Sequence, residues 1–159
     1  MFASLLRMAT AALALVVSST PAAAQESPLA LEGDVMLVRV SLDAQGQQQS
    51  ELVEPDVIVP GDRLLFTTDY SNNGSAPVTD FVLTNPVPAA VRLAPDADPA
   101  LEVSVDGGRT WGLLPTLSVI LADDTSRAAE HADVTHIRWT LASVEPGQSG
   151  RIEYPAIIR

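Results

Sequence analysis

The chain contains no cysteine and no lysine among its 159 residues. Without cysteine it can build neither a disulfide framework nor a thiolate metal site, and it has no cysteine nucleophile. All nine basic residues are arginine, and against 20 acidic residues they leave a formal net charge of −11. Because nucleic-acid binding needs a basic face that neutralises phosphates, this charge excludes nucleic acid as the expected partner.

Aromatic residues and long apolar runs are also scarce. Aromatics make up 4% of the chain, which argues against a carbohydrate-stacking platform, although Trp111 and Trp139 remain candidates if they are exposed. No apolar run is long enough for a polytopic membrane protein. A hydrophobic content of 47% nevertheless excludes a disordered acidic tail, and the length favours one domain.

The motifs of common catalytic sites are missing as well. The chain has no G-x-S-x-G nucleophile elbow, no H-E-x-x-H zinc motif and no phosphate-cradling G-x-x-x-x-G-K-[ST] loop. Two of its many carboxylates could act as acid and base, but nothing in the sequence singles out a pair. We therefore expect a non-enzymatic protein without a cofactor. The alternative, an enzyme of unrecognised chemistry, would need a concave pocket with converging titratable groups.

The first 24 residues have the layout of a secretory signal peptide. Arg7 supplies the positive charge, residues 8–17 are apolar except for Thr10, and Ala22 and Ala24 occupy the small-residue positions before Gln25. A membrane anchor is less favoured, because a span needs about 20 apolar residues. We predict that residues 1–24 are removed and that residues 25–159 form one exported domain, in the periplasm or outside the cell.

Five stretches of this domain alternate apolar and polar residues with a period of two: 35–43, 63–70, 101–105, 136–141 and 151–158. In the first stretch, one face carries Met36, Val38, Val40 and Leu42, and the other carries Arg39, Ser41 and Asp43 together with Val35 and Leu37. Such alternation is typical of half-buried antiparallel strands with a wet outer face. Turn sequences at residues 60–62, 72–75 and 145–148 separate the stretches, so the pattern predicts an all-β, antiparallel β-sandwich.

Two local features refine this expectation. Pro155 lies inside the last stretch, which favours an edge strand or a bulge there, because proline cannot donate to a sheet ladder. Residues 123–133 are the one segment with helical character, one or two turns capped by Asp123 or Asp124.

A longer motif begins at the Pro-Gly-Asp turn of residues 60–62. It continues as Phe-Thr-Thr-Asp-Tyr-Ser-Asn-Asn-Gly over residues 66–74 and as Asn-Pro-Val-Pro over residues 85–88. Together with residues 133–139 and 146–150, this pattern resembles the bacterial conserved-repeat family called domain of unknown function 11. The resemblance covers about residues 30–159 and implies an immunoglobulin-like sandwich of an exported or cell-surface protein. Members of that family commonly carry tandem copies, whereas this chain has one.

Residues 104–111 match the pattern S-x-D-x-G-x-T-W through Ser104, Asp106, Gly108, Thr110 and Trp111. The pattern resembles the Asp-box repeated on sialidase propellers, where it is structural. Asp106 can accept backbone N–H groups across the turn, glycine permits a positive φ, and Trp111 can fold over the hairpin. A whole propeller needs more blades than this chain can supply. We predict a structural role for this Asp-box, with glycan contact as the alternative.

Metal ligands are sparse in type and scattered in sequence. His131 and His136 are the only histidines; they lack a third histidine or cysteine, and their spacing suits neither a helix face nor a strand face. An oxygen-rich Ca²⁺ site could draw on aspartates of three loops: Asp96, Asp98, Asp106, Asp123 and Asp124. We predict no metal site and an exported structural or protein-interaction module of the cell envelope, whose partner is an envelope protein or surface component. A small Ca²⁺- or glycan-binding domain is the alternative.

Overall fold

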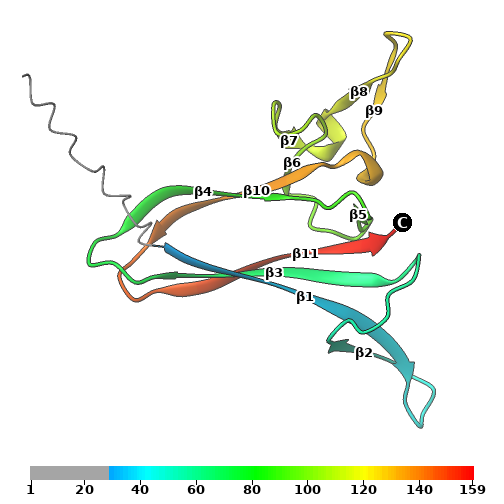
Figure 1. Ribbon diagram of the computed structural model, residues 1–159, viewed down its shortest axis with the longest axis horizontal. Coiled ribbons are helices and arrows are strands. Elements are labelled where there is room, and N and C mark those ends of the chain that lie inside the picture. Colours follow the sequence, from blue (N-terminus) through cyan, green and yellow to red (C-terminus); the bar gives the residue numbers. More distant parts are fainter. Residues whose placement is uncertain (1–28) are drawn as a thin grey trace, which may run out of the picture.

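The computed structural model describes residues 29–159, so the predicted signal peptide lies outside the described residues. The chain is an immunoglobulin-like antiparallel β-sandwich, which confirms the predicted fold class (Figure 1). Within residues 29–159 there is no α-helix, only the two 3₁₀ turns η1 (Leu114–Thr116) and η2 (His131–Asp133).

Two sheets face each other, and a small third sheet stands apart. The first sheet has the order β2 (Gln48–Val53), β1 (Leu29–Leu42), β3 (Arg63–Asn72), β11 (Ser149–Ile158) and β5 (Val91–Leu93). The second has the order β4 (Val78–Pro86), β10 (His136–Val144), β6 (Glu102–Ser104) and β7 (Gly112–Leu113). The third is the hairpin of β8 (Ser118–Ile120) and β9 (Ser126–Ala128). This hairpin and the far end of the β1–β2 hairpin project in opposite directions from the body (Figure 1).

The core lies between the two larger sheets and is centred on Tyr154 of β11. Phe66 of β3 stacks on the Tyr154 ring with 4.9 Å between centroids, and Trp139 of β10 approaches from the second sheet at 6.2 Å. Ile137 and Val103, neighbours across β10 and β6, complete the fully buried centre. Even-numbered residues of β3 and β11 therefore point inward, and odd-numbered residues point outward.

Asn72 ties the two sheets together at one end of the sandwich. Its buried side chain donates through Nδ2 to the carbonyl oxygens of Val144 (2.8 Å) and Ala76 (2.9 Å). Its Oδ1 accepts from the N–H of Gly74 (2.9 Å), closing the predicted turn after β3. Every polar atom of the amide side chain thus has a backbone partner, as a buried amide requires.

The register of β1 reverses the expectation drawn from its alternation. Val35 pairs with Phe66 and Leu37 with Leu64, so these two residues of the mixed face pack on the core. The fully apolar face of Met36, Val38, Val40 and Leu42 is turned away from the second sheet, and Val40 and Leu42 are exposed. The alternation predicted the strand correctly, but the prediction of which face is exposed to solvent was wrong.

Pro155 is not in an edge strand, contrary to expectation. β11 lies between β3 and β5, and Pro155 pairs with Leu65 without a break in register. On its other side, β11 pairs with β5 over residues 156–158 only. Pro155, which has no N–H to donate, therefore lies just beyond the end of the β5–β11 ladder. The carbonyl oxygen of Pro155 still accepts from the N–H of Ala94 at 3.0 Å.

The helix predicted over residues 123–133 is wrong. The segment contains a turn, β9 and the short 3₁₀ turn η2. The Asp123 carboxylate accepts from the N–H and the hydroxyl of Thr125, 3.1 and 2.6 Å away, which closes a β-hairpin turn instead of capping a helix. Asp and Thr form such local hydrogen bonds readily, and these compete with helix formation.

Candidate functional site

The Asp-box residues come together in the loop between β6 and β7. Ser104 is the last residue of β6, and Trp111 immediately precedes β7. The loop lies over the outer face of the four-stranded sheet, because its Trp111 contacts His136 and Arg138, which flank the buried Ile137 on β10 and point away from the core.

The Asp106 carboxylate organises this loop as an acceptor. Its Oδ1 accepts from the N–H groups of Arg109 and Thr110, each at 3.0 Å, and from the Ser104 hydroxyl at 2.8 Å. Its Oδ2 accepts from the Thr110 hydroxyl at 2.7 Å. The Thr110 backbone N–H, followed by the two hydroxyls, holds the pKa of Asp106 far below its usual range. The group is therefore a permanent anion engaged by its own loop, which is the opposite of a poised general acid.

Ser104 and Thr135 connect the loop to the sheet. The buried Ser104 hydroxyl accepts from the N–H of Gly108 at 2.9 Å. The Thr135 N–H donates to the Ser104 carbonyl at 2.8 Å, and the Thr135 hydroxyl accepts from the N–H of Gly107 at 3.1 Å. Gly107 and Gly108 have φ of 80° and 86°, a conformation that residues with a Cβ rarely adopt. Thr135 was not identified in the sequence, because it is distant in the chain from the Asp-box.

Trp111 closes the loop from its outer side. The indole Nε1 donates to the carbonyl of Gly108 at 2.9 Å, and the ring is half-buried. The His136 ring meets it edge-on at 6.4 Å, and the Arg138 guanidinium lies over it, with 4.5 Å from Cζ to the ring centroid. One aromatic face of Trp111 is thus occupied by a cation of the same chain, which makes it unavailable for stacking against a sugar.

Arg138 is itself held by Glu102 of the neighbouring strand β6. Its Nε and Nη2 donate to the two carboxylate oxygens at 2.7 and 2.6 Å, a bidentate pair on the outer face of the sheet. The Arg138 hydrogen bonds lower the pKa of Glu102. The alternation of residues 101–105 and 136–141 puts Glu102 and Arg138 on the polar faces of two predicted strands. It does not pair them, because pairing depends on strand order.

The candidate metal ligands occupy separate places. His131 belongs to η2 and lines a small cavity of about 260 Å³ with Leu93, Pro95 and Leu101, whereas His136 contacts Trp111. Among residues 29–159, no three His, Asp or Glu side chains are grouped so that they could hold a metal ion. Four of the five aspartates considered for Ca²⁺ make other contacts: Asp96 binds Arg63, Asp98 accepts from the N–H of Ala100, Asp106 belongs to the Asp-box and Asp123 accepts from Thr125.

A hollow of about 630 Å³ opens over β1, β3 and β11. Its charged lining consists of Glu32, Asp69 and Arg151. Arg151 donates to both oxygens of Asp69, at 2.7 and 2.8 Å, and these hydrogen bonds lower the pKa of Asp69. A carboxylate held in this way is an acceptor and not a proton donor at neutral pH, so Asp69 is not placed to act as a general acid.

The second tryptophan considered for glycan contact, Trp139, packs against the core beside Tyr154. No helix within residues 29–159 has the length and apolar character needed to cross a membrane. No protein-family model matches this chain, nor does any curated protein or solved structure show significant similarity to it. The resemblance to domain of unknown function 11 therefore stays a prediction that rests on the motifs alone.

Proposed function

We propose that this chain is an exported, non-enzymatic structural or protein-interaction module of the bacterial cell envelope. The signal-peptide layout of residues 1–24 supports export. In this proposal the Asp-box is part of the scaffold, because the Asp106 carboxylate and the hydroxyls of Ser104 and Thr110 form hydrogen bonds within the loop.

The observation that carries the proposal is the exposed apolar face of the β1–β2 hairpin. Val40, Leu42 and Leu52 expose 56%, 68% and 49% of their surface, and register places all three on the same face. The loop after β2 adds exposed Val57, Ile58 and Val59. Single exposed apolar residues are ordinary, whereas a contiguous group on one projecting element is typical of a surface that binds another protein.

The Ca²⁺- or glycan-binding alternative has less support. Four of the five aspartates on which it depended contact different partners, and Trp111 is covered on one face by Arg138. A rise in melting temperature with Ca²⁺ or with a glycan would reverse this preference, because a ligand that binds only the folded state stabilises it.

Site-specific photocrosslinking in the envelope tests the proposal. A photoreactive residue replaces Leu42, on the projecting hairpin, or Ser75, in the turn at the opposite end of the sandwich. We expect a discrete crosslinked protein from position 42 and none from position 75. Equal crosslinking from both positions would contradict the proposal. So would hydrolysis of a glycan, ester or peptide substrate, if substitution of one carboxylate abolished that activity.

A further inference from the structure

Strand β1 has an open edge. On one side it pairs with β3 over residues 29–37, and on the other side it pairs with β2 over residues 37–42 only. On the β2 side, residues 29–36 have no strand partner within the described chain. Such an edge presents unpaired backbone N–H and C=O groups to which a further extended segment can bind.

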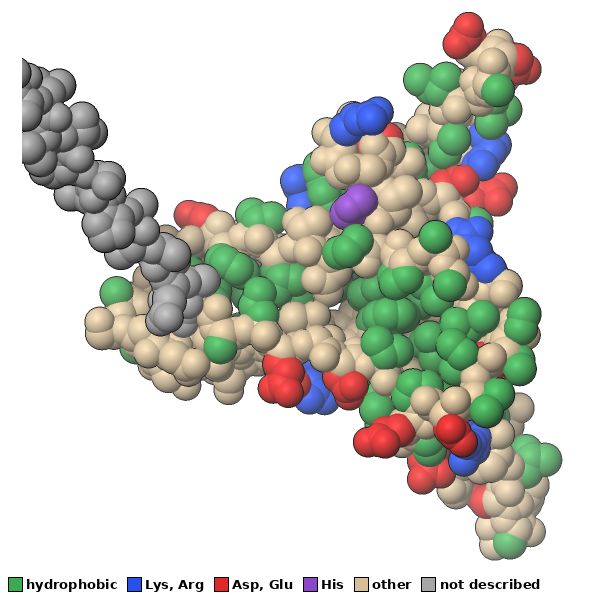
Figure 2. Space-filling view, in the orientation of Figure 1, with side chains coloured by type: hydrophobic (Ala, Val, Ile, Leu, Met, Phe, Trp, Pro, Cys, Tyr) green, Lys and Arg blue, Asp and Glu red, His purple; other side chains and the backbone are tan. Residues whose placement is uncertain are grey.

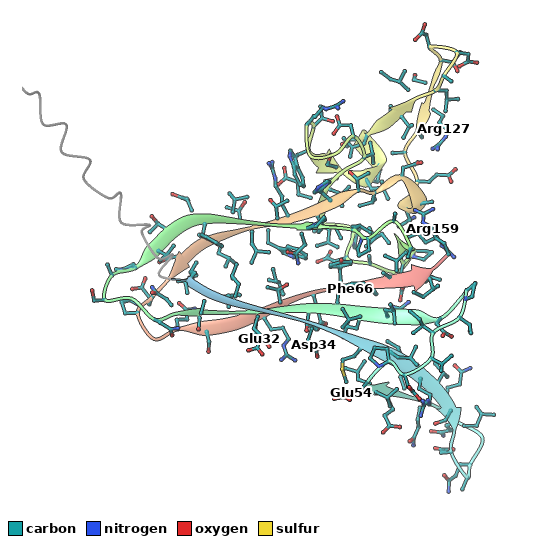
Figure 3. All side chains as sticks on the ribbon, viewed as in Figure 1. Glu32, Asp34, Glu54, Phe66, Arg127 and Arg159 are labelled. Atoms are coloured by element: carbon teal, nitrogen blue, oxygen red, sulfur yellow. The ribbon has the colours of Figure 1, made fainter. Side chains whose placement is uncertain are left out.

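The two faces of this edge differ in character. Glu32 and Asp34 point away from the second sheet, as Figure 3 shows, while Leu31, Gly33 and Val35 alternate with them and face inward. Figure 2 shows acidic side chains gathered along the underside of this sheet.

The acidic side carries more negative charge than its own arginine can balance. Glu32 lies across β1 and β3 from Asp69, which is bound to Arg151, and Asp34 lies in the next row with Thr67 and Glu153. Within residues 29–159, Glu32 and Asp34 form no ion pair.

The inner side of the edge opens into a space lined by apolar side chains together with polar groups of Thr67, Thr68 and Asn85. A cavity of about 230 Å³ lies between the sheets at Gly33 and Val35, and Phe66, Pro86 and Tyr154 contribute to its wall. A Cβ built on Gly33 would contact only the carbonyl oxygen of Thr67, at an ordinary van der Waals distance of 3.9 Å. The space beside Gly33 can therefore accommodate a side chain. An apolar side chain from a neighbouring strand can enter this space.

We infer that the open edge of β1, residues 29–36, binds an extended segment of a partner protein in which basic and apolar residues alternate. This inference rests on the proposed function and names the partner's chemistry. An added strand places alternate side chains on opposite faces, so its basic residues meet Glu32 and Asp34 while its apolar residues enter beside Gly33.

Charge selects this occupant over the others. Anionic lipid and nucleic acid are repelled by the same carboxylates that attract arginine or lysine. A second copy presents the same acidic edge and a net charge of −11. Residues 1–28 hold one basic residue, Arg7, so the chain's own N-terminal segment lacks the alternating charge.

Peptide titration against the full chain tests the inference. The probe is a synthetic, strand-length peptide alternating arginine and valine; its controls are a glutamate–valine peptide and a block peptide of the same arginine and valine content. We expect saturable binding of the alternating arginine peptide only, and new protection from hydrogen exchange of those alternate amides of residues 29–36 that point away from β3. Binding should weaken as salt is raised, because exposed ion pairs are screened.

Variants separate the two faces of the edge. E32Q/D34N should weaken binding about tenfold, the effect expected when two exposed ion pairs are lost. G33L fills the space between the sheets and should abolish binding while the protein remains folded by circular dichroism. D80N/D124N removes the same charge at two exposed positions with φ of 51° and 63°, where asparagine is equally tolerated, and should bind like the unaltered chain.

Each opposite result overturns the inference: equal binding of the glutamate or block peptide, unchanged binding by E32Q/D34N, or no protection at residues 29–36. Dimerisation abolished by G33L would assign the edge to a second copy instead. If crosslinking from Leu42 still captures a partner while the peptide fails to bind, only this inference falls. If crosslinking captures nothing, the proposed function falls as well.

Discussion

The Arg138 guanidinium lies over the Trp111 ring with 4.5 Å between Cζ and the ring centroid, and this contact joins the Asp-box loop to strand β10. The cation is held in place by a bidentate pair with Glu102 on the adjacent strand. A residue that resembled a ligand-stacking platform is therefore covered on one face by its own sheet. Its surroundings are those of a packed side chain.

Replacing Trp111 by alanine should lower stability without affecting any binding. The half-buried ring packs on Gly108 and Arg138, so we expect a loss of roughly 2 kcal/mol, below the range for a fully buried tryptophan. Denaturant unfolding measures this loss. Trp111→Phe keeps a ring but loses the Nε1 hydrogen bond, so its stability should lie between those of the parent chain and Trp111→Ala. An unchanged midpoint for Trp111→Ala would instead indicate that the ring is free to bind a ligand.

Acid should destabilise the protein in part through Glu102. Its pKa is lowered by Arg138 from the ordinary value of 4.5, so the unfolded chain takes up the proton more readily than the folded one. Stability contributed by this pair is present above pH 4.5 and is lost as the pH falls below that value. Unfolding free energies measured over a pH series should fall less steeply for Glu102→Gln than for the parent chain. Parallel curves would show that the pair contributes nothing.

Alkali should act through Tyr154. Burial raises its pKa from 10.0 to about 12, so the folded chain keeps the phenolic proton that the unfolded chain releases. Stability should therefore decline as the pH rises from about 10 towards 12, and Tyr154→Phe should remove this decline while it preserves the stack on Phe66. A late phenolate absorbance change, seen in the parent and missing in the variant, identifies the group. Phenolate absorbance from Tyr154 near pH 10 would contradict burial.

Asn72 should be among the most sensitive polar positions. Asn72→Ala leaves the buried carbonyl of Val144 without its side-chain donor and the Gly74 N–H without its acceptor, and we expect a cost of about 2–4 kcal/mol. Asn73→Ala, one residue further and exposed, is the matched control and should change stability by about 0.5 kcal/mol or less. Similar melting temperatures for the two variants would rule out this role of Asn72.

Export should remove residues 1–24. Intact mass of the protein recovered from outside the cytoplasm should correspond to a chain that begins at Gln25, with the small residues Ala22 and Ala24 at the cleavage site. Arginine in place of Ala24 should block cleavage. A mass that retains residue 1 would show that the segment is an anchor and not a signal.

Local chemistry was readable directly from the sequence. The hydrogen bonds that the Asp-box residues make with one another join positions at most four apart, so the spacing of Ser104, Asp106 and Thr110 accounts for these local contacts. The bonds to Thr135 span about 30 positions and depend on the fold. Alternation similarly indicated strands, because side-chain direction in a strand has a period of two. The hairpin of β8 and β9 was missed because its turn chemistry, Asp followed by Thr, also suits a helix cap.

Tertiary structure decided which surfaces meet. Alternation along β1 distinguishes two faces, but which face is buried depends on pairing with β3, where Val35 lies beside Phe66 and Leu37 beside Leu64. Because β2 pairs with β1 over residues 37–42 only, Glu32 and Asp34 lie on an open edge. The pairing of β10 with β6 brings Glu102 to Arg138 across strands that are distant in the chain. Strand order is a balance of contacts over the whole sandwich, so no single segment of sequence contains it.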